Sequence, residues 1–303
     1  MMHVALMWTI NDFLACGILS GWSTKGKLAC PCCNKNTFST RLTNGGKQCY
    51  MGHRRYLPMN HKWRNSRVSF AGTKERGVAP NLLSSEDVLK QVQDLEGITL
   101  TKSHQFKTKI NHENRRDNWN KKSIFFKLPY WSTLLLRHNL DVMHIEKNIC
   151  DNILGTIMNV KGKTKYNLKS RLDLKSMHIQ PELHPFVQGE KVLLPPASYV
   201  LSPKEKDAFL LFLKKLRVPD GFSSNISQCV NLRDHKIVGL KSHDCHVLIQ
   251  HILPIALRGI VPNDVCEALI ELSLFFKILS GKALRVKEIE EIESQTRMEY
   301  KFY

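Results

Sequence analysis

The chain has 303 residues, of which 42% are hydrophobic, and this composition is typical of a globular protein that can bury a core. It contains 45 Lys and Arg residues against 27 Asp and Glu residues, which gives a formal net charge of +18. A surplus of this size indicates a polyanionic partner, and nucleic acid is the usual one; the alternative is a generic basic surface. No apolar segment reaches the length that spans a bilayer, so we expect no membrane partner.

The chain contains nine cysteines. The first 19 residues are rich in apolar side chains, but they have no basic start, and Asn11 and Asp12 interrupt them. They therefore do not resemble a secretory signal. We expect reduced, intracellular thiols, some of which bind metal.

Residues 3–10, HVALMWTI, predict a buried strand, and Asp12 stands just past its end. An acid at this position can be a metal ligand in the cleft at the carboxyl edge of a sheet. The alternative is a turn aspartate, which is common.

A C-x-x-C motif joins Cys30 to Cys33, and two histidines follow at His53 and His61. Two thiolates and two imidazoles are enough for tetrahedral Zn²⁺, so these four residues predict a structural zinc site. The spacing of the histidines is longer than in a DNA-reading zinc finger. Two further thiols could substitute as ligands: Cys32 and Cys49. The alternative is a set of free buried thiols.

Residues 53–67 carry basic and aromatic side chains but no acid. This combination suits backbone phosphates and stacked bases, so it predicts a nucleic-acid interface. A solvated basic face is the alternative. The predicted contact residues are Arg54, Arg55, Lys62, Trp63, Arg64 and Arg67.

The stretch Leu134–Asp151 has the most informative pattern. A short apolar run, Leu134–Leu136, predicts a buried strand that ends near Asp141 and feeds a helix carrying His144. Carboxylates at strand ends point into one cleft, so this arrangement is common in metal-dependent active sites. The alternative is that Asp141 caps the helix and His144 is a polar residue of its first turn.

Four further helices are predicted. Ser84 begins one, with Val88 and Val92 on its buried face, and Ser202-Pro203 begins another that runs to about Arg217. A third follows residues 241–246, where His243 and His246 could form a metal site or contact DNA, or where Ser242 or Asp244 simply caps the helix.

A fourth helix begins at Asn263-Asp264 and has a strongly apolar face. Glu267 and Glu271 lie within it, four positions apart. A carboxylate on a mostly buried helix is costly unless it is paired or bound to metal, although both could face solvent.

Seven stretches in the same order resemble the transposase family of plant CACTA (En/Spm-like) DNA transposons, and together they cover nearly the whole chain. They are LMWTINDF at 6–13, GWSTKGKLACPCC at 21–33, GHRRYLPMNHKWR at 52–64, LPYWSTLLLRHNLDVMHIEKN at 128–148, LPPASYVLS at 194–202, LKSHDCHVLIQHILPIAL at 240–257 and ALIELSLFF at 268–276.

The resemblance implies an α/β fold: an incomplete RNase H-like (DDE transposase) core with a zinc-binding insertion and a largely helical C-terminal half. In this family three acids hold two divalent metal ions, Mg²⁺ or Mn²⁺, for DNA cleavage and strand transfer. By position, Asp12 resembles the second acid, Asp141 and His144 match the D-x-x-H signature, and Glu271 is expected to be the third acid, with Glu267 as runner-up. The cysteines and histidines of the predicted zinc site match the family's insertion.

The first acid is expected on a core strand that precedes anything in this sequence, so we expect a transposase fragment that binds DNA but is inactive alone. The alternative is a zinc-stabilised, non-catalytic nucleic-acid-binding or protein-interaction module. DNA and other transposase subunits are the expected partners, and the nucleus is the expected location. The predicted segments are 1–29 (core strand with Asp12), 30–67 (zinc insertion and basic run), 68–127 (loop-rich basic segment), 128–160 (core strand and helix), 161–262 (mostly helical insertion) and 263–303 (late core helix and C-terminal region).

Overall fold

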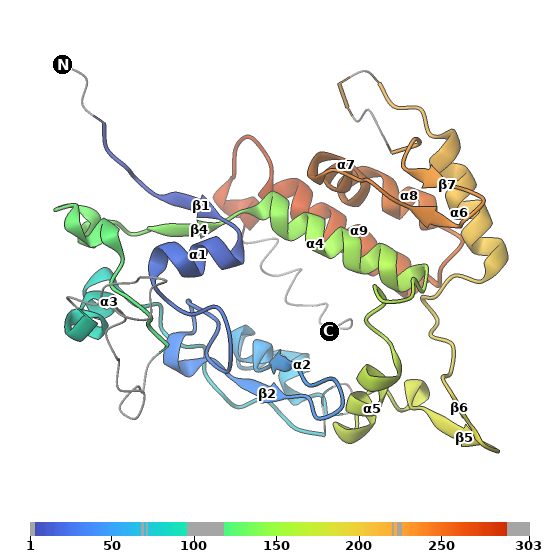
Figure 1. Ribbon diagram of the computed structural model, residues 1–303, viewed down its shortest axis with the longest axis horizontal. Helices are drawn as coiled ribbons and strands as arrows, with labels where there is room; N and C mark the ends of the chain where they lie inside the picture. The colour runs from blue at the N-terminus through green and yellow to red at the C-terminus, as the bar shows by residue number, and fades with distance from the viewer. Residues whose placement is uncertain are drawn as a thin grey trace, which may run out of the picture. The chain divides into compact units, whose positions relative to one another are not determined.

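A computed structural model describes residues 4–67, 70, 72–95, 118–219, 221–222 and 226–289 (Figure 1). It divides into two compact units, each assembled from two stretches of chain. Unit 1 comprises Met1–Tyr56 and Glu75–Asp141, and unit 2 comprises Leu57–Lys74 and Val142–Tyr303. The division after Asp141 falls inside the predicted segment 128–160, and residues 96–117 of the predicted segment 68–127 lie outside the described residues.

Unit 1 contains a parallel pair of strands. Strand β1 (Thr9–Asn11) pairs with β4 (His138–Leu140), with Thr9 opposite His138 and Asn11 opposite Leu140. The prediction of a buried strand over residues 3–10 is wrong in extent, because only its last two residues enter β1. Val4 is 83% exposed and Trp8 is 51% exposed, since neither lies in the paired part of the strand.

The second predicted strand also begins later than expected. Leu135 and Leu136 are 98% and 64% exposed, so the apolar run at 134–136 is not a buried strand. The chain turns inward at Trp131 instead, whose side chain is fully buried in the short 3₁₀-helix η7 (Trp131–Thr133). Strand β4 then starts at His138.

Helix α1 (Phe13–Ser20) follows β1 directly. Asp12 is its N-cap, with Oδ1 accepting a hydrogen bond from the Ala15 N–H at 2.6 Å. Gly21 ends the helix in the left-handed conformation, with φ of 90°. A Cβ at this position would overlap the carbonyl oxygen of Lys121, so the turn requires glycine.

The core of unit 1 is built on two tryptophans and helix α3 (Ser85–Gln91). Trp22 and Trp119 meet edge to face and pack with Val88 and Val92. Ser84 caps α3, and Asp87 completes a capping box, which confirms the predicted helix start. The helix ends at Gln91 and a 3₁₀ turn, η3 (Gln93–Leu95), follows.

Unit 2 is largely helical (Figure 1). Helix α4 (Val142–Ile157) packs against α7 (Ser242–Val247), and α9 (Asn263–Leu279) packs against α8 (Leu253–Leu257). Helix α6 (Pro203–Lys215) starts after its N-cap Ser202, as predicted, and Glu205 completes a capping box there. Their apolar faces form one core, whose fully buried members include Cys150, Phe209, Leu210, Leu213, Cys245, Leu248 and Leu257.

The helix predicted after residue 246 is interrupted. A π-helical turn, η9 (Leu248–Ile252), separates α7 from α8. Pro254 has no backbone N–H to donate to the carbonyl of Gln250, four positions earlier. The Ser273 hydroxyl of α9 donates to that carbonyl instead, at 2.7 Å, so α9 satisfies the group that the proline leaves open.

The remaining elements are short. No described helix is long and apolar enough to cross a membrane. The elements of unit 1 are η1 (Asn34–Asn36), the antiparallel strands β2 (Ser39–Arg41) and β3 (Gln48–Tyr50), η2 (His53–Tyr56) and η6 (Ile124–Lys127). Those of unit 2 are α2 (Lys62–Asn65), α5 (Leu168–Ser176), η8 (Pro181–Leu183) and the antiparallel pairs β5 (Phe186–Gln188) with β6 (Lys191–Leu193) and β7 (Val230–Asn231) with β8 (Lys236–Ile237).

Candidate functional site

Two acids lie at the carboxyl ends of the parallel strands. Asp12 follows β1, and Asp141 follows β4. The Asp141 N–H donates to the carbonyl oxygen of Asn11 at 2.7 Å, which continues the ladder by one residue and brings the two backbones together. Asp12 uses Oδ1 to cap α1, which leaves its other carboxylate oxygen for a cation. Neighbouring parallel strands that both end in an acid form the edge at which metal sites are usually built.

The first residue of β4, His138, is enclosed beside this edge. Its Nδ1 lies 2.8 Å from the Thr9 hydroxyl, and its ring contacts Phe125 and Trp131. Burial, together with the nearby Arg137 charge, lowers the pKa of His138 to about 4. The imidazole is therefore neutral at pH 7 and forms part of the packing that holds β4 against β1.

The other predicted catalytic residues belong to unit 2. His144 lies in the first turn of α4, which begins directly after Asp141, and it is partly exposed. Glu271 is partly buried on α9, whereas Glu267 is exposed. Helix α9 begins at Asn263, as predicted, but its N-cap is Pro262, and Asp264 lies in the first turn.

The cysteines of the C-x-x-C motif gather in unit 1. The Cys30 thiol hydrogen bonds to Cys32, which lowers the pKa of the Cys32 thiol to about 7 and raises that of Cys30. Cys33 Sγ lies 3.0 Å from the Tyr56 hydroxyl and accepts a hydrogen bond from the Arg55 guanidinium at 3.4 Å. Burial and this thiol raise the pKa of Tyr56 to about 12.

The two predicted histidine ligands have other partners. His53 Nε2 lies 3.0 Å from the carbonyl oxygen of Tyr50, and His61 is the N-cap of α2, with Nδ1 accepting from the Trp63 N–H. Across the described residues, no three His, Cys, Asp or Glu side chains form a group that could hold a metal ion. The donor types suit zinc, but the structure does not gather them.

The predicted nucleic-acid residues differ in exposure. Arg54 and Arg64 are buried, and Arg64 donates to the Leu57 carbonyl at 3.1 Å, so its guanidinium is used inside unit 2. Lys62 and Arg67 are exposed, Arg55 is partly exposed, and Trp63 is partly exposed with the Lys62 ammonium above its ring. The accessible members are therefore the following: Arg55, Lys62, Trp63 and Arg67.

A buried acid and a histidine form a further polar centre in unit 2. Glu146 of α4 is fully buried, and its Oε2 lies 2.7 Å from Nδ1 of His246 on α7. Gln250 of the π-helical turn reaches the same nitrogen at 3.1 Å. Glu146 Oε1 is buried and has no hydrogen-bond partner within the described chain. The pair thus adds a buried polar contact to the packing of α7 on α4.

The sequence reasoning singled out His246 but missed its partner. Glu146 occupies a position one turn before Cys150, on the face that also carries Ile149 and Ile153. An acid at helical spacing from a buried stripe is the signal that could have identified it. His243 makes a separate contact, from Nε2 to the Phe222 carbonyl at 2.9 Å, and Asp244 accepts from the Lys241 N–H at 2.9 Å, so the capping alternative is correct for Asp244.

Comparison with known proteins gives one match. Residues 1–95 match the model of the Transposase_21 family, described as transposase family tnp2. This segment contains β1, Asp12 and the cysteine cluster. No curated protein and no solved structure matches the chain. The N-terminal third of the chain is therefore similar to a family of transposases.

Proposed function

We propose that the chain is part of a DDE-type transposase of the plant CACTA (En/Spm-like) class, with an RNase H-like core, and that it acts on DNA in the nucleus. The observation that carries this proposal is the parallel pairing of β1 with β4, which sets Asp12 and Asp141 at adjacent strand ends. The transposase-family match over residues 1–95 and the net charge of +18 support it independently.

The proposed roles follow from the chemistry of each side chain. Asp12 and Asp141 would hold a divalent cation, with Glu271 as a third acid and His144 orienting a neighbouring carboxylate or a phosphate. When bound, Mg²⁺ or Mn²⁺ would supply activation of water or a 3′-hydroxyl and stabilisation of the leaving oxygen. Carboxylate oxygens are the ligands that these hard cations prefer.

DNA contact is proposed for the accessible part of the predicted interface. Lys62 and Arg67 can bind backbone phosphates, and Trp63 offers a partly exposed ring on which a base can stack. Arg54 and Arg64 would support these segments from inside rather than touch DNA, because both are buried.

Replacing Asp12 by asparagine tests the metal role. Asparagine caps a helix about as well as aspartate, so the folded protein should keep its stability while losing a charged ligand. We expect the affinity for Mn²⁺ in the presence of duplex DNA to fall by at least the roughly tenfold that loss of an outer-shell partner costs in other metal sites. Titration of free Mn²⁺ by electron paramagnetic resonance measures this.

Asp12→Ala is the matched control, because it removes both the charge and the cap and should also cost about 1 kcal/mol of stability. Unchanged Mn²⁺ affinity in Asp12→Asn would contradict the proposal. In the same samples, metal-dependent cutting of a labelled duplex that persists in Asp12→Asn would exclude Asp12 as a ligand.

A structural zinc ion is also proposed, with the Cys30 and Cys33 thiolates as two of its ligands. The support is the C-x-x-C spacing, with Cys33 N–H donating to Cys30 Sγ at 3.4 Å. We expect about one zinc per chain in purified protein, measured by elemental analysis, and a loss of that zinc in Cys30→Ser. A zinc content near zero in the native protein would contradict this proposal.

A further inference from the structure

A groove on unit 2 has the chemistry of an anion site. It lies between α4 and the chain that follows β8, and encloses about 220 Å³. Its polar lining consists of Lys147, Asp151 and Lys163. Its apolar lining includes Leu154, Met158 and Val238. Two lysines and one aspartate therefore line a space large enough for a phosphate and part of the group esterified to it.

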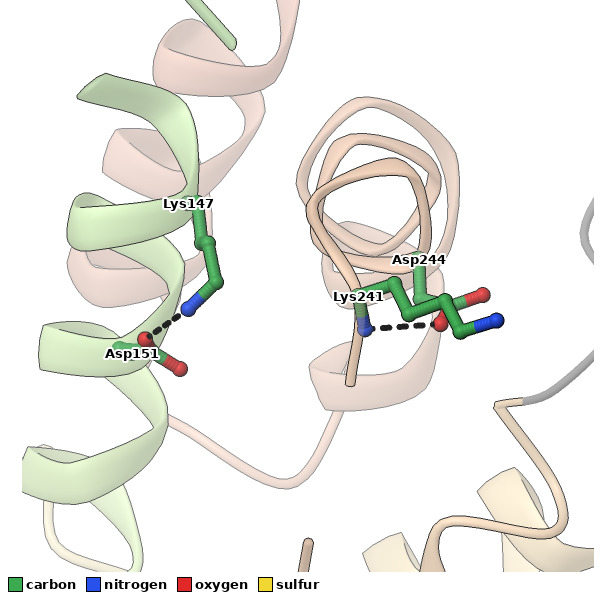
Figure 2. A network of polar contacts seen from close by, with 4 residues as sticks. All are labelled: Lys147, Asp151, Lys241 and Asp244. Carbon is green, nitrogen blue, oxygen red and sulfur yellow. Dashed lines mark hydrogen bonds and ion pairs between the residues drawn. The ribbon is translucent and has the colours of Figure 1, made fainter. Parts of the chain in front are cut away.

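Lys147 is held only loosely by its partner. Its Nζ lies 3.0 Å from Asp151 Oδ2, one turn along α4, as Figure 2 shows. Both side chains are partly exposed, at 32% and 46%. An exposed pair of this kind contributes little to stability, so a phosphate can replace Asp151 as the partner of Lys147 at small cost.

Lys163 supplies the second charge. It is exposed, and its ammonium group has no hydrogen bond or ion pair with any described residue. A turn places it here: the Val160 N–H donates to the Gly155 carbonyl, and the Lys163 N–H donates to that of Val160. A Cβ on Gly155 would come within 2.9 Å of Lys163 Cβ, so the glycine in α4 allows the turn to approach.

The surroundings of the groove favour an anion further. The stretch 161–175 contains six Lys or Arg residues and one acid, Asp173, which is buried. Its exposed charges are therefore all positive: Lys161, Lys163, Lys165, Lys169 and Lys175. Lys241 is not part of the groove, because its ammonium extends to the side away from α4 in Figure 2.

We infer that this groove binds a backbone phosphate of DNA, with Lys147 and Lys163 as its counter-charges. That the phosphate belongs to DNA rests on the proposed function. That the groove binds a phosphate at all rests on the groove alone. The row of exposed lysines along 161–175 gives neighbouring phosphates of the same strand their own counter-charges. Asp151, the partner of Lys147 in the free protein, would weaken phosphate binding, since its negative charge repels the ligand.

The test is the salt dependence of DNA binding by the full chain, measured by fluorescence anisotropy with a labelled duplex. The logarithm of the binding constant falls linearly with the logarithm of the salt concentration, and each lost phosphate contact makes this negative slope shallower by about 0.9. We expect Lys147→Gln combined with Lys163→Gln to remove the one phosphate contact of the groove, and so to reduce the magnitude of the slope by about 0.9. Lys204→Gln combined with Lys282→Gln removes the same charge from exposed positions outside the groove and should lower it by less than half as much.

Asp151→Asn gives an effect of the opposite sign. It should strengthen binding more than Asp207→Asn, which removes the same charge at the exposed pair with His235. Equal effects of groove and control variants would overturn the inference and leave the proposed function standing.

A second arm separates the groove from the source of the phosphate. Inorganic phosphate should raise the melting temperature of the native chain relative to chloride at equal ionic strength, and should raise that of the double groove variant by less, since only the general salt effect of phosphate is left there. If the native chain binds no DNA but keeps this phosphate effect, the groove stands as a site for a small phosphate and the proposed function fails. If inorganic phosphate stabilises both proteins equally, the inference fails.

Discussion

Replacing His246 by alanine is expected to lower the free energy of unfolding by about 3 kcal/mol or more. The change leaves the fully buried carboxyl group of Glu146 without the nitrogen that lies 2.7 Å from it, and its other oxygen already has no partner in the described chain. Removing one member of a buried polar pair leaves the other desolvated and uncompensated, which is the costly case. Urea unfolding followed by circular dichroism measures the loss.

Two variants show whether the cost comes from the pair. His251→Ala removes a partly exposed histidine of the same helical stretch that contacts the Phe222 ring, and should cost about 1 kcal/mol or less. Adding Glu146→Leu to His246→Ala should restore part of the stability, because an apolar side chain of similar volume replaces the orphaned acid. If the two substitutions are additive in this cycle, the contact between α4 and α7 does not carry the energy we assign to it.

Local signals in the sequence predicted several elements because the cause of each is local. The helix starts predicted at Ser84 and at Ser202-Pro203 both form, and in the structure each is completed by a capping box, with Asp87 and with Glu205. A cap depends on residues three positions apart, so no distant part of the chain is needed to recognise it. The helix after Asp141 was predicted in the same way, from the apolar residues Ile149 and Ile153 at helical spacing, and both lie in α4.

The strands were less predictable because their burial depends on distant neighbours. The apolar runs at 3–10 and 134–136 have the composition of buried strands, yet the paired residues are Thr9–Asn11 and His138–Leu140. Those two segments are more than a hundred positions apart, so neither shows from its own sequence where pairing begins. The position of Asp12 and Asp141 at the strand ends was nevertheless predictable, since each follows its apolar run within five positions.

The π-helical turn and the polar centre could not be predicted for the same reason. Pro254 predicts an irregular helix, but the hydrogen bond to the Gln250 carbonyl comes from Ser273 of α9, nineteen positions later in the chain. His246 pairs with Glu146 across one hundred positions of chain. Exposure divided the basic run: Arg64 and Lys62 are two positions apart and equivalent in charge, but only tertiary packing buries the first.

Replacing Trp22 by alanine should destabilise unit 1 by about 3–5 kcal/mol. Its side chain is fully buried, its indole N–H donates to the Leu28 carbonyl at 2.8 Å, and its ring meets Trp119 with centroids 4.9 Å apart. The backbone on either side of Trp22 is bonded to residues 118 and 120, so the cavity would open where two distant segments of the unit join. Urea unfolding measured by near-ultraviolet circular dichroism reports this loss.

Trp8→Ala is the matched control, because it removes the same side chain from a site in the same unit that is 51% exposed, and it should cost about 1 kcal/mol or less. Trp22→Phe keeps an aromatic ring but removes one of the two hydrogen bonds to the Leu28 carbonyl, which also accepts from the Asn118 side-chain amide at 3.1 Å, so an intermediate loss of about 1–3 kcal/mol is expected. If Trp8→Ala and Trp22→Ala lose the same free energy of unfolding, the pair Trp22 and Trp119 does not form the core of unit 1. The metal role of Asp12 would then lack the rigid support that a binding site needs, since β1 and α1 belong to that unit.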